Sequence, residues 1–350
     1  MSEEQMIAGT EYIDPGEMYF SELTEYCLAK GWPKFRAKQI YEWIHKKQAC
    51  SADQMTNLPK EMREVLREDL ITVEEETRLT SKLDGTIKFL YRMKDNQMIE
   101  TVFMKYSYGN TICISSQAGC AMGCKFCASA IGGRIRNLTA SEMLGQVYRT
   151  MQLTGERVSN IVVMGTGESL DNYDNLIRFL KLITAEDGYN LSMRNITVSS
   201  CGLVPEIKRL ADEGFPLTFA LSLHAVTDEE RKKIMPIANR YSIAQTLDAC
   251  RYYFDKTGRR VSFEYSLMAG VNDSEEQAKK LASLIAGLHG HVNLIPINPV
   301  SERDYKTVTH EAAERFKKIL EKYHINVTIR RGMGADIDAA CGQLRRTYKI

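Results

Sequence analysis

Three cysteines stand close together in the stretch QAGCAMGCKFCAS, residues 117–129. Cys120, Cys124 and Cys127 have the spacing C-x3-C-x2-C, and the glycines between them let the backbone turn closely around a bound group. Three thiolates this close can hold one face of a four-iron cluster, whose fourth iron then stays open to a small ligand. A zinc site completed by a remote His or Cys is the alternative, although no second C-x2-C pair follows in the chain.

Another cysteine is isolated near the carboxyl end, in RGMGADIDAACGQLRR (331–346). No second cysteine lies within metal-ligand spacing of Cys341, and no hydrophobic period explains it. An accessible thiol can instead act as a nucleophile. The chain has nine cysteines, an odd number, which argues against a disulfide framework and for metal-binding or catalytic thiols.

The pattern of the chain predicts how these residues are positioned. Residues 1–70 are expected to form a small helical accessory domain that contacts RNA, and residues 71–106 a β-hairpin connector with Asp84–Gly85 at its turn. From residue 107 to 350, strands and helices alternate. The expected strands are 111–116, 160–165, 195–200, 217–224, 261–268, 292–298 and 326–330, and the expected helices are 139–155, 173–185, 204–214, 243–256, 274–288 and 310–324.

Strand–helix alternation of this length predicts a parallel α/β sheet, and six or more units favour a complete or partial barrel. The site of such a fold lies at the carboxyl ends of the strands. The cysteine stretch directly follows the first strand of this region. GTGE (165–168) follows the second strand, where Glu168 can receive an ammonium group.

Composition sets further bounds. The chain has 350 residues and a net charge of +1, and it contains no apolar run long enough to cross a membrane. Its acidic, mixed start does not resemble a secretory signal, so a cytoplasmic location is expected. Basic residues gather in short clusters that could contact phosphate, at 34–38, 46–47, 134–136, 231–233, 259–260, 330–331 and 345–346.

C-x3-C-x2-C with an aromatic residue before the last cysteine, placed after the first strand of a β/α chain, resembles the radical S-adenosylmethionine (SAM) enzymes. The likeness extends over nearly the whole chain to the RNA methyltransferases that act on adenine C2, and to their relatives that methylate C8. The segments that carry it include FRAKQIYEWIHKK, IETVFM, CISSQAGCAMGCKFCAS, MGTGESLDNYDN, LSLHA, NLIPINP and DIDAACGQLRR. The resemblance implies a partial (β/α) barrel of radical SAM type, one 4Fe–4S cluster and two SAM molecules per turnover.

The resemblance also assigns residues. Cys120, Cys124 and Cys127 match the cluster ligands, and the SAM contacts match Gly167, Glu168, Ser199, Ser222, Leu223, His224 and Asn298. Cys341 matches the cysteine that the first SAM methylates. A radical from the second SAM activates that methyl group for addition to adenine C2. Glu100 then accepts the C2 proton, and Cys113 attacks Cys341, which releases the methylated base and forms a disulfide.

The same resemblance implies 23S rRNA and tRNA as partners, an electron donor such as flavodoxin or ferredoxin, and a monomer. Residue type alone favours plainer interpretations: Cys113 as a small buried strand residue, Glu100 as a solvated edge residue, and Cys27, Cys50, Cys201 and Cys250 as structural. Three alternatives stay open, namely a C8-specific methyltransferase that confers antibiotic resistance, a zinc-stabilised RNA-binding protein and another radical SAM enzyme. The chain departs from the family at Ser169, where proline is common.

Overall fold

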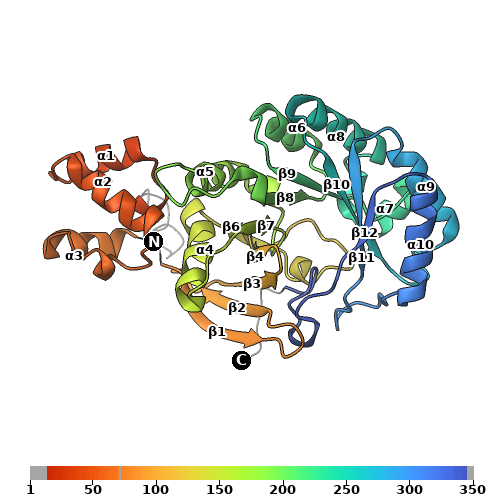
Figure 1. The fold of residues 1–350 in the computed structure, drawn as a ribbon, viewed down its shortest axis with the longest axis horizontal. Helices are drawn as coiled ribbons and strands as arrows, with labels where there is room; N and C mark the ends of the chain where they lie inside the picture. Colours follow the sequence, from red (N-terminus) through yellow and green to blue (C-terminus); the bar gives the residue numbers. More distant parts are fainter. Residues whose placement is uncertain (1–13, 71, 345–350) are drawn as a thin grey trace, which may run out of the picture.

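One mixed sheet runs through the larger part of the protein, whose computed structural model describes residues 14–70 and 72–344 (Figure 1). Its ten strands lie in the order β1-β2-β3-β4-β7-β8-β9-β10-β11-β12. The first four pair antiparallel, and the rest, from β4 onward, pair parallel. The strands are β1 (Glu74–Thr80), β2 (Ile87–Arg92), β3 (Met98–Tyr106), β4 (Gly109–Ile114), β7 (Asn160–Val163), β8 (Ile196–Ser200), β9 (Thr218–Ser222), β10 (Val261–Leu267), β11 (Gly290–Pro296) and β12 (Val327–Ile329).

Helices cover the outer face of this curved sheet, as the alternation predicts (Figure 1). They are α4 (Ala140–Thr154), α5 (Tyr173–Ile183), α6 (Val204–Asp212), α7 (Asp228–Ile234), α8 (Ile243–Thr257), α9 (Glu275–Ile285) and α10 (His310–Lys322). A capping box of Thr139 and Glu142 starts α4. The predicted segments are confirmed, but α7 was missed, because its sequence DEERKKI carries only charges around one terminal isoleucine and so has no apolar period.

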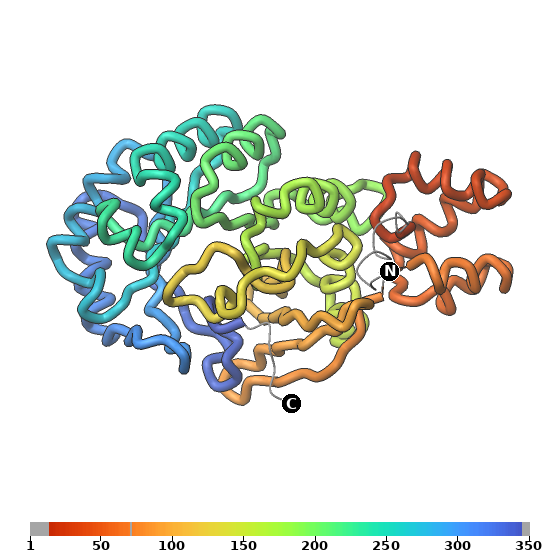
Figure 2. Tube along the Cα trace, turned by 180° about the vertical axis from the view of Figure 1, so that it is seen from behind, coloured from red at the N-terminus to blue at the C-terminus, as the bar shows by residue number. Residues whose placement is uncertain are grey.

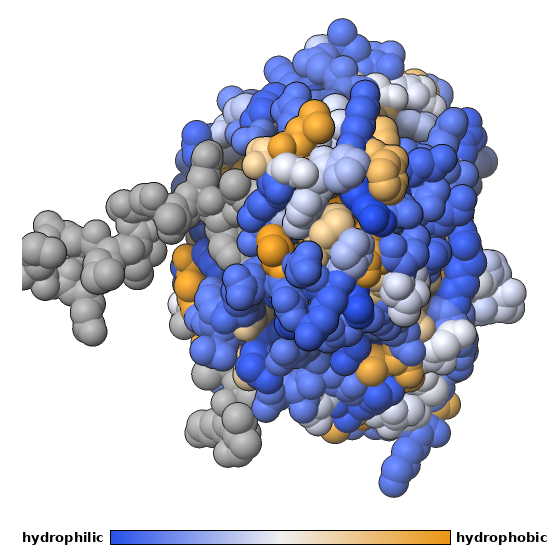
Figure 3. Space-filling view, turned by 90° about the vertical axis from the view of Figure 1, so that its left-hand side faces the viewer, coloured by the Kyte–Doolittle hydropathy of each residue, from blue (hydrophilic) through white to orange (hydrophobic). Residues whose placement is uncertain are grey.

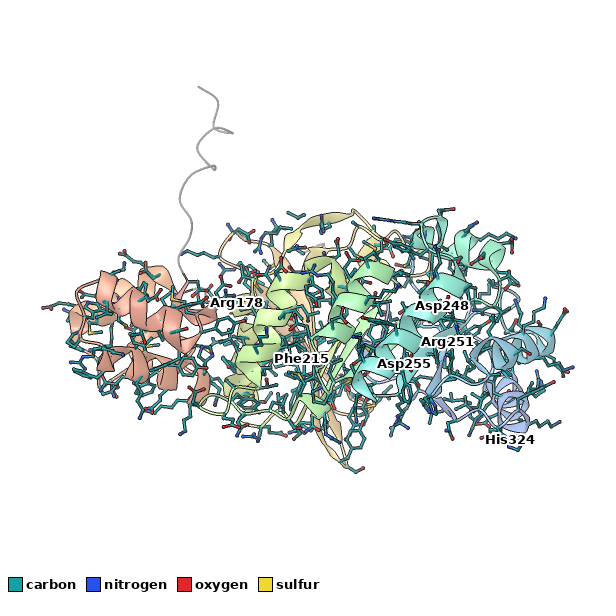
Figure 4. The ribbon with its side chains drawn as sticks, turned by 90° about the horizontal axis from the view of Figure 1, so that it is seen from above. Arg178, Phe215, Asp248, Arg251, Asp255 and His324 are labelled. Atoms are coloured by element: carbon teal, nitrogen blue, oxygen red, sulfur yellow. The ribbon has the colours of Figure 1, made fainter. Side chains whose placement is uncertain are left out.

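A small helical unit precedes the sheet and projects from one end of the molecule (Figure 1). It contains α1 (Phe20–Ala29), α2 (Phe35–Tyr41) and α3 (Lys60–Asp69), packed on the fully buried Leu23, Ile40 and Leu66. Arg178 on α5, labelled in Figure 4, joins it to the rest of the chain by donating to both oxygens of Glu22 at 2.6 and 3.1 Å. Within the described residues, no helix is both long and apolar enough to span a membrane.

The β-hairpin at residues 74–92 forms as expected, with Thr80 opposite Ile87 across the turn. It is more than a connector, however. Strand β3 continues from it and pairs with β4, so that the hairpin extends the main sheet. The sheet therefore has β1 at one edge and β12 at the other, as in a partial barrel.

The segment after β12 folds back toward the hairpin, and Figure 2 shows this carboxyl-terminal chain beside strands from the opposite edge of the sheet. Asp336 accepts hydrogen bonds from the Ser81 hydroxyl at 2.6 Å and from the Lys82 amide at 3.0 Å. Asp84 in turn accepts one from the Gly334 amide at 3.0 Å. The segment is thus fixed to the hairpin by hydrogen bonds from both sides of the contact. Arg345 and Arg346, which could contact phosphate, lie outside the described residues.

Candidate active site

The three clustered cysteines lie on one loop that leaves β5 (Gln117–Gly119), a short strand paired with β6 (Arg134–Asn137). The loop is anchored through its backbone, since the Cys120 amide donates to Gly133 at 3.2 Å and the Lys125 amide to Ile234 at 2.9 Å. Gly119 has a φ of +80°, and a Cβ there would stand 2.0 Å from the Gly133 carbonyl oxygen, so only glycine fits this approach. The loop is therefore held in one tight path.

All three thiols open into the same cavity at the carboxyl ends of the strands. Burial raises the pKa of Cys120 to about 12 and that of Cys124 well above its ordinary value, and the nearby Cys127 raises both further. Buried thiols of this kind favour binding a cation, because a metal stabilises the thiolate that burial disfavours. Within residues 14–70 and 72–344, no three Cys, His, Asp or Glu side chains converge closely enough for a single metal ion.

The opposite wall of this first cavity comes from the strand ends. Six of the residues assigned to SAM line it: Gly167, Glu168, Ser199, Ser222, His224 and Asn298. Gly167 has a φ of +113°, and a Cβ there would come within 2.7 Å of Gln117. Leu223 is fully buried and does not line the cavity; its amide donates to the Glu264 carbonyl at 3.0 Å. Its side chain therefore packs in the hydrophobic core.

Glu168 is a buried carboxylate in this cavity, at the start of a short 3-10 turn (Ser169–Asn172). It accepts hydrogen bonds from the Cys201 amide at 2.8 Å and the Leu170 amide at 3.2 Å. Burial raises its pKa, and those backbone donors oppose the rise. A carboxylate has more lone pairs than two donors use, so it can still receive a ligand ammonium.

His224 lies two residues after the end of β9 and has a left-handed backbone, with φ +58°. Its Nδ1 accepts from the Ser266 amide at 2.9 Å, which leaves the proton of the neutral ring on Nε2. Burial lowers the pKa of His224 to about 3, and the Arg231 charge lowers it further, so the ring is neutral near pH 7. It packs edge-on against Phe126, with ring centres 5.0 Å apart. The cluster loop and the strand ends thus meet through these two rings.

A second cavity adjoins the first, and Cys341 lines both. The Asn298 amide group donates to the Cys341 carbonyl at 3.2 Å, and the Ala128 amide donates to the Gly342 carbonyl at 2.8 Å. Cys113 on β4 lines the second cavity together with Val102 and Met104 from β3. The structure therefore places the isolated thiol between the cysteine-rich cavity and the cavity that holds Cys113.

The exposed surface of Cys341 faces these cavities. Burial by the surrounding atoms raises the pKa of its thiol, whereas the Arg330 guanidinium lowers it. Burial raises the pKa of Cys113 to about 12, Cys341 raises it further, and Arg330 opposes the rise. Arg330 follows β12 and lines both cavities. All nine cysteines are free thiols, so the expected disulfide bond is not supported by the structure.

Glu100 is fully buried near the start of β3, so its interpretation as a solvated edge residue is wrong. It lines neither cavity, but it lies on the same face of β3 as Val102, two residues further along. Lys88 on β2 approaches it, with 3.0 Å between the Lys88 ammonium and Oε1 of Glu100. Except for Leu223, the structure thus brings the other assigned residues to the cavities, whereas Glu100 lies beside Val102 in the strand that lines the second one.

Sequence reasoning missed several polar residues that line the first cavity. Glu264 on β10 is buried and accepts hydrogen bonds from Ser262 at 2.7 Å and from Asn293 at 2.8 Å. A carboxylate inside a predicted strand was the signal that could have identified it. The sequence marks Arg330 only as part of a basic cluster.

Comparisons with known proteins agree with this geometry. The family model "Radical SAM superfamily" matches residues 114–282, and "Ribosomal RNA large subunit methyltransferase N-terminal domain" matches residues 16–71. The chain is similar to a probable dual-specificity RNA methyltransferase RlmN of Lachnoclostridium phytofermentans, with 57% identity over 97% of this chain and 96% of the relative. It is 56% identical to the protein of the same name from Lachnospira eligens, over 96% of each chain.

A solved structure gives the same result. The crystal structure of a radical SAM methyltransferase from Sphaerobacter thermophilus superimposes with a TM-score of 0.92 at 44% identity. The match covers 96% of this chain and 100% of that chain. The expected barrel of radical SAM type with a helical amino-terminal part is confirmed.

Proposed function

This chain belongs to the radical SAM RNA methyltransferases of the RlmN family, and from that premise we propose that it methylates adenosine C2 in 23S rRNA and in tRNA. One observation carries the proposal: the Cys341 thiol lines both the cavity with the three cysteines and the cavity with Cys113. A methyl carrier must reach its donor and its acceptor in turn. Cys341 has that position.

Radical SAM enzymes use a 4Fe–4S cluster and SAM, and the residues of the first cavity fit both groups. Cys120, Cys124 and Cys127 would hold the cluster from their common loop. Glu168 would receive the SAM ammonium, and the neutral His224 ring would donate from Nε2. When bound, these groups supply a methyl donor and, after one-electron reduction, a carbon radical that abstracts hydrogen. The family match favours this cluster over the zinc alternative.

The residues of the chain then have separate tasks. Cys341 accepts the methyl group on its sulfur, which needs a nucleophilic thiol, and Arg330 favours the thiolate there. Cys341 next carries the activated carbon to adenine C2. Glu100 takes the C2 proton, and Cys113 is the second thiol, which releases the methylated base. Methyl transfer through a thiol avoids direct polar attack on C2, an electrophilic carbon.

The RNA must present a single adenosine to this site. C2 lies on the Watson–Crick edge of adenine, so the base is taken from a loop or flipped out of a helix. The helical unit at residues 14–70 would contact the RNA, since Lys34, Lys38, Lys46 and Lys47 are exposed on it. The face that it presents in Figure 3 is mostly hydrophilic. We include in the proposal the three domains 1–70, 71–106 and 107–350, a cytoplasmic monomer, and flavodoxin or ferredoxin as electron donor.

Methylation at C8 is the alternative that shares these residues. The curated relatives carry the name of the dual-specificity enzymes, which favours the C2 branch. Nucleoside analysis separates the two reactions: RNA from cells that express the chain should gain 2-methyladenosine. Gain of 8-methyladenosine instead would establish the alternative.

The decisive experiment is mass spectrometry of the peptide that contains Cys341, after anaerobic incubation of the reconstituted protein with SAM. We expect one added methyl group on Cys341 and none on the half-buried Cys50, which serves as the internal control. The Cys113→Ala variant should then accumulate a covalent adduct with the RNA. An unmodified Cys341 peptide, together with RNA that is still methylated, would overturn the proposed role of this thiol.

A further inference from the structure

Lys88 is a buried cation on strand β2 of the hairpin, next to Glu100. It is 6% exposed, and Glu100 opposite it is 0% exposed. Charged side chains are seldom buried so fully unless they are paired. The Lys88 ammonium lies 3.0 Å from Oε1 of Glu100 and donates to the Asp338 carbonyl at 3.1 Å. It thus joins β2, β3 and the carboxyl-terminal segment.

The second of these contacts leads to Cys341. Asp338 stands three residues before Cys341, and its carboxylate accepts from the Gln343 amide group at 3.2 Å. Gln343 in turn accepts from the Ala340 amide, also at 3.2 Å. The turn that presents Cys341 is therefore hydrogen-bonded within itself and is also held by the hydrogen bond from Lys88. One ammonium group fixes both the carboxylate and the backbone that carries the thiol.

The register of the strands places these groups on one face. Lys88 pairs with Val102 across β2 and β3, and Val102 pairs with Cys113 across β3 and β4. Glu100, Val102 and Cys113 therefore share the side of the sheet that faces the second cavity. Stability alone does not account for an ion pair there, because two apolar side chains of similar volume would stabilise the fold as well or better.

We propose that Lys88 is a positioning residue for RNA methylation, which holds Glu100 as an oriented carboxylate in register with the Cys341 turn. The inference rests on the proposed function, in which Glu100 takes the C2 proton. In that step the C2–H bond breaks, its electron pair stays with the base, and the proton moves to a carboxylate oxygen of Glu100. Lys88 forms no bond to the base. Its contact at 3.0 Å fixes where the carboxylate of Glu100 lies before the proton moves.

The experiment distinguishes positioning of Glu100 from structural support of the turn that carries Cys341. Lys88→Met and Lys88→Gln are compared with wild type and with Ser81→Ala, which removes a different contact to the same segment, the 2.6 Å bond to Asp336. Each reconstituted holoprotein is assayed for S-methylation of Cys341 and for methylation of an RNA oligonucleotide whose target adenosine carries either hydrogen or deuterium at C2. Lys88→Arg serves as the conservative rescue variant.

We expect Lys88→Met to lower RNA methylation about tenfold or more, the scale of a lost acid–base contribution. Cys341 methylation should stay within about twofold of wild type, because that step does not involve Glu100 and the turn keeps its hydrogen bonds from Asn298 and Ala128. The deuterium isotope effect on RNA methylation should exceed that of wild type, and Lys88→Arg should restore most of the rate. Lys88→Gln removes the charge but can still donate a hydrogen bond, so it should lose less rate than Lys88→Met and still show a larger isotope effect than wild type. It supplies the readout if the methionine variant does not fold.

Three results would overturn the inference: an unchanged isotope effect in Lys88→Met and Lys88→Gln, an equal loss of Cys341 methylation and RNA methylation, or an isotope effect in Ser81→Ala raised as much as in Lys88→Met. Failure of the proposed function looks different. In that case the wild-type protein itself would not place a methyl group on the RNA. The wild-type protein therefore tests the proposed function, and the Lys88 variants test the inference about Lys88.

Discussion

Gln146 on α4 offers a test of how the site is held in place, because its side chain is 0% exposed and every polar atom is used. Oε1 accepts from the Thr101 hydroxyl and the Ser115 amide, both at 2.8 Å. Nε2 donates to the carbonyls of Ser115 at 3.0 Å and of Glu142 at 3.3 Å. Ser115 directly follows β4 and precedes the cysteine loop. Gln146 thus fastens the helix to the strand end from which that loop leaves.

The substitution Gln146→Leu keeps the size of the side chain and removes its hydrogen bonds. The Ser115 amide, the Ser115 carbonyl and the Thr101 hydroxyl then lose their partner in a place without water. Each buried group left without a partner destabilises the fold by about 1–3 kcal/mol, whereas burial of the apolar leucine side chain stabilises it by only about 1 kcal/mol. We expect the free energy of unfolding to fall by about 3 kcal/mol. An unfolding entropy of about 0.7 kcal/mol per kelvin for a chain of this size converts this to a Tm about 4 °C lower.

The assay is thermal unfolding followed by circular dichroism, with matched cluster content and protein concentration. Gln152→Leu on the same helix is the control, since Gln152 is half-buried and donates to the Gln48 carbonyl at 3.0 Å and to Gln54 at 3.2 Å. Water can replace those bonds, so its Tm should change by about 1 °C or less. Equal shifts in the two variants would refute the reasoning, because they would mean that burial of the hydrogen-bonding groups does not set the cost.

Further predictions concern charge and pH. S-methylation of Cys341 should accelerate between about pH 7 and pH 9, because the raised pKa leaves little thiolate at neutral pH; the methylated peptide is measured against time by mass spectrometry. Arg330→Met should slow that reaction severalfold at pH 7.5 and less at pH 9, since Arg330 lowers the thiol pKa. Burial lowers the pKa of His45 to about 3, so below its ordinary value of 6.5 only the unfolded chain binds this proton and stability falls with acid. His45→Leu should therefore reduce the slope of unfolding free energy against pH between 5 and 6.5 by up to about 1.4 kcal/mol per unit, measured by urea titration.

The parts of the site that are local in sequence could be predicted well. The spacing of Cys120, Cys124 and Cys127 is contained in one loop, and that loop follows a strand that its apolar residues identify. Glu168 was predicted because it ends the turn after the next strand. The carboxyl ends of parallel strands meet at one edge, so the order of the strands alone brings these residues together.

Residues that meet through long-range contacts could be assigned to the site only from the family resemblance, and some could not be assigned at all. The Ser129 hydroxyl donates to the Leu344 carbonyl at 2.7 Å, across a separation of 215 residues. A hydrophobic period describes only neighbouring residues of one element, so it cannot predict such a contact. Lys88 occupies a polar position in an alternating strand, a pattern typical of a solvated face. It is buried because the carboxyl-terminal segment covers that face, which the strand itself does not reveal.

The open barrel explains why one thiol can serve two cavities. Because β1 and β12 are both edges of the sheet, a gap remains between the hairpin and the last strands. The segment at 331–344 occupies this gap, bonded to the hairpin through Asp336 and to the cysteine loop through the Gly342 carbonyl. It thereby forms a wall that the two cavities share, and Cys341 lies in that wall. A closed barrel would have no such shared wall, so the missing closure of the sheet is what gives a single sulfur access to both sides.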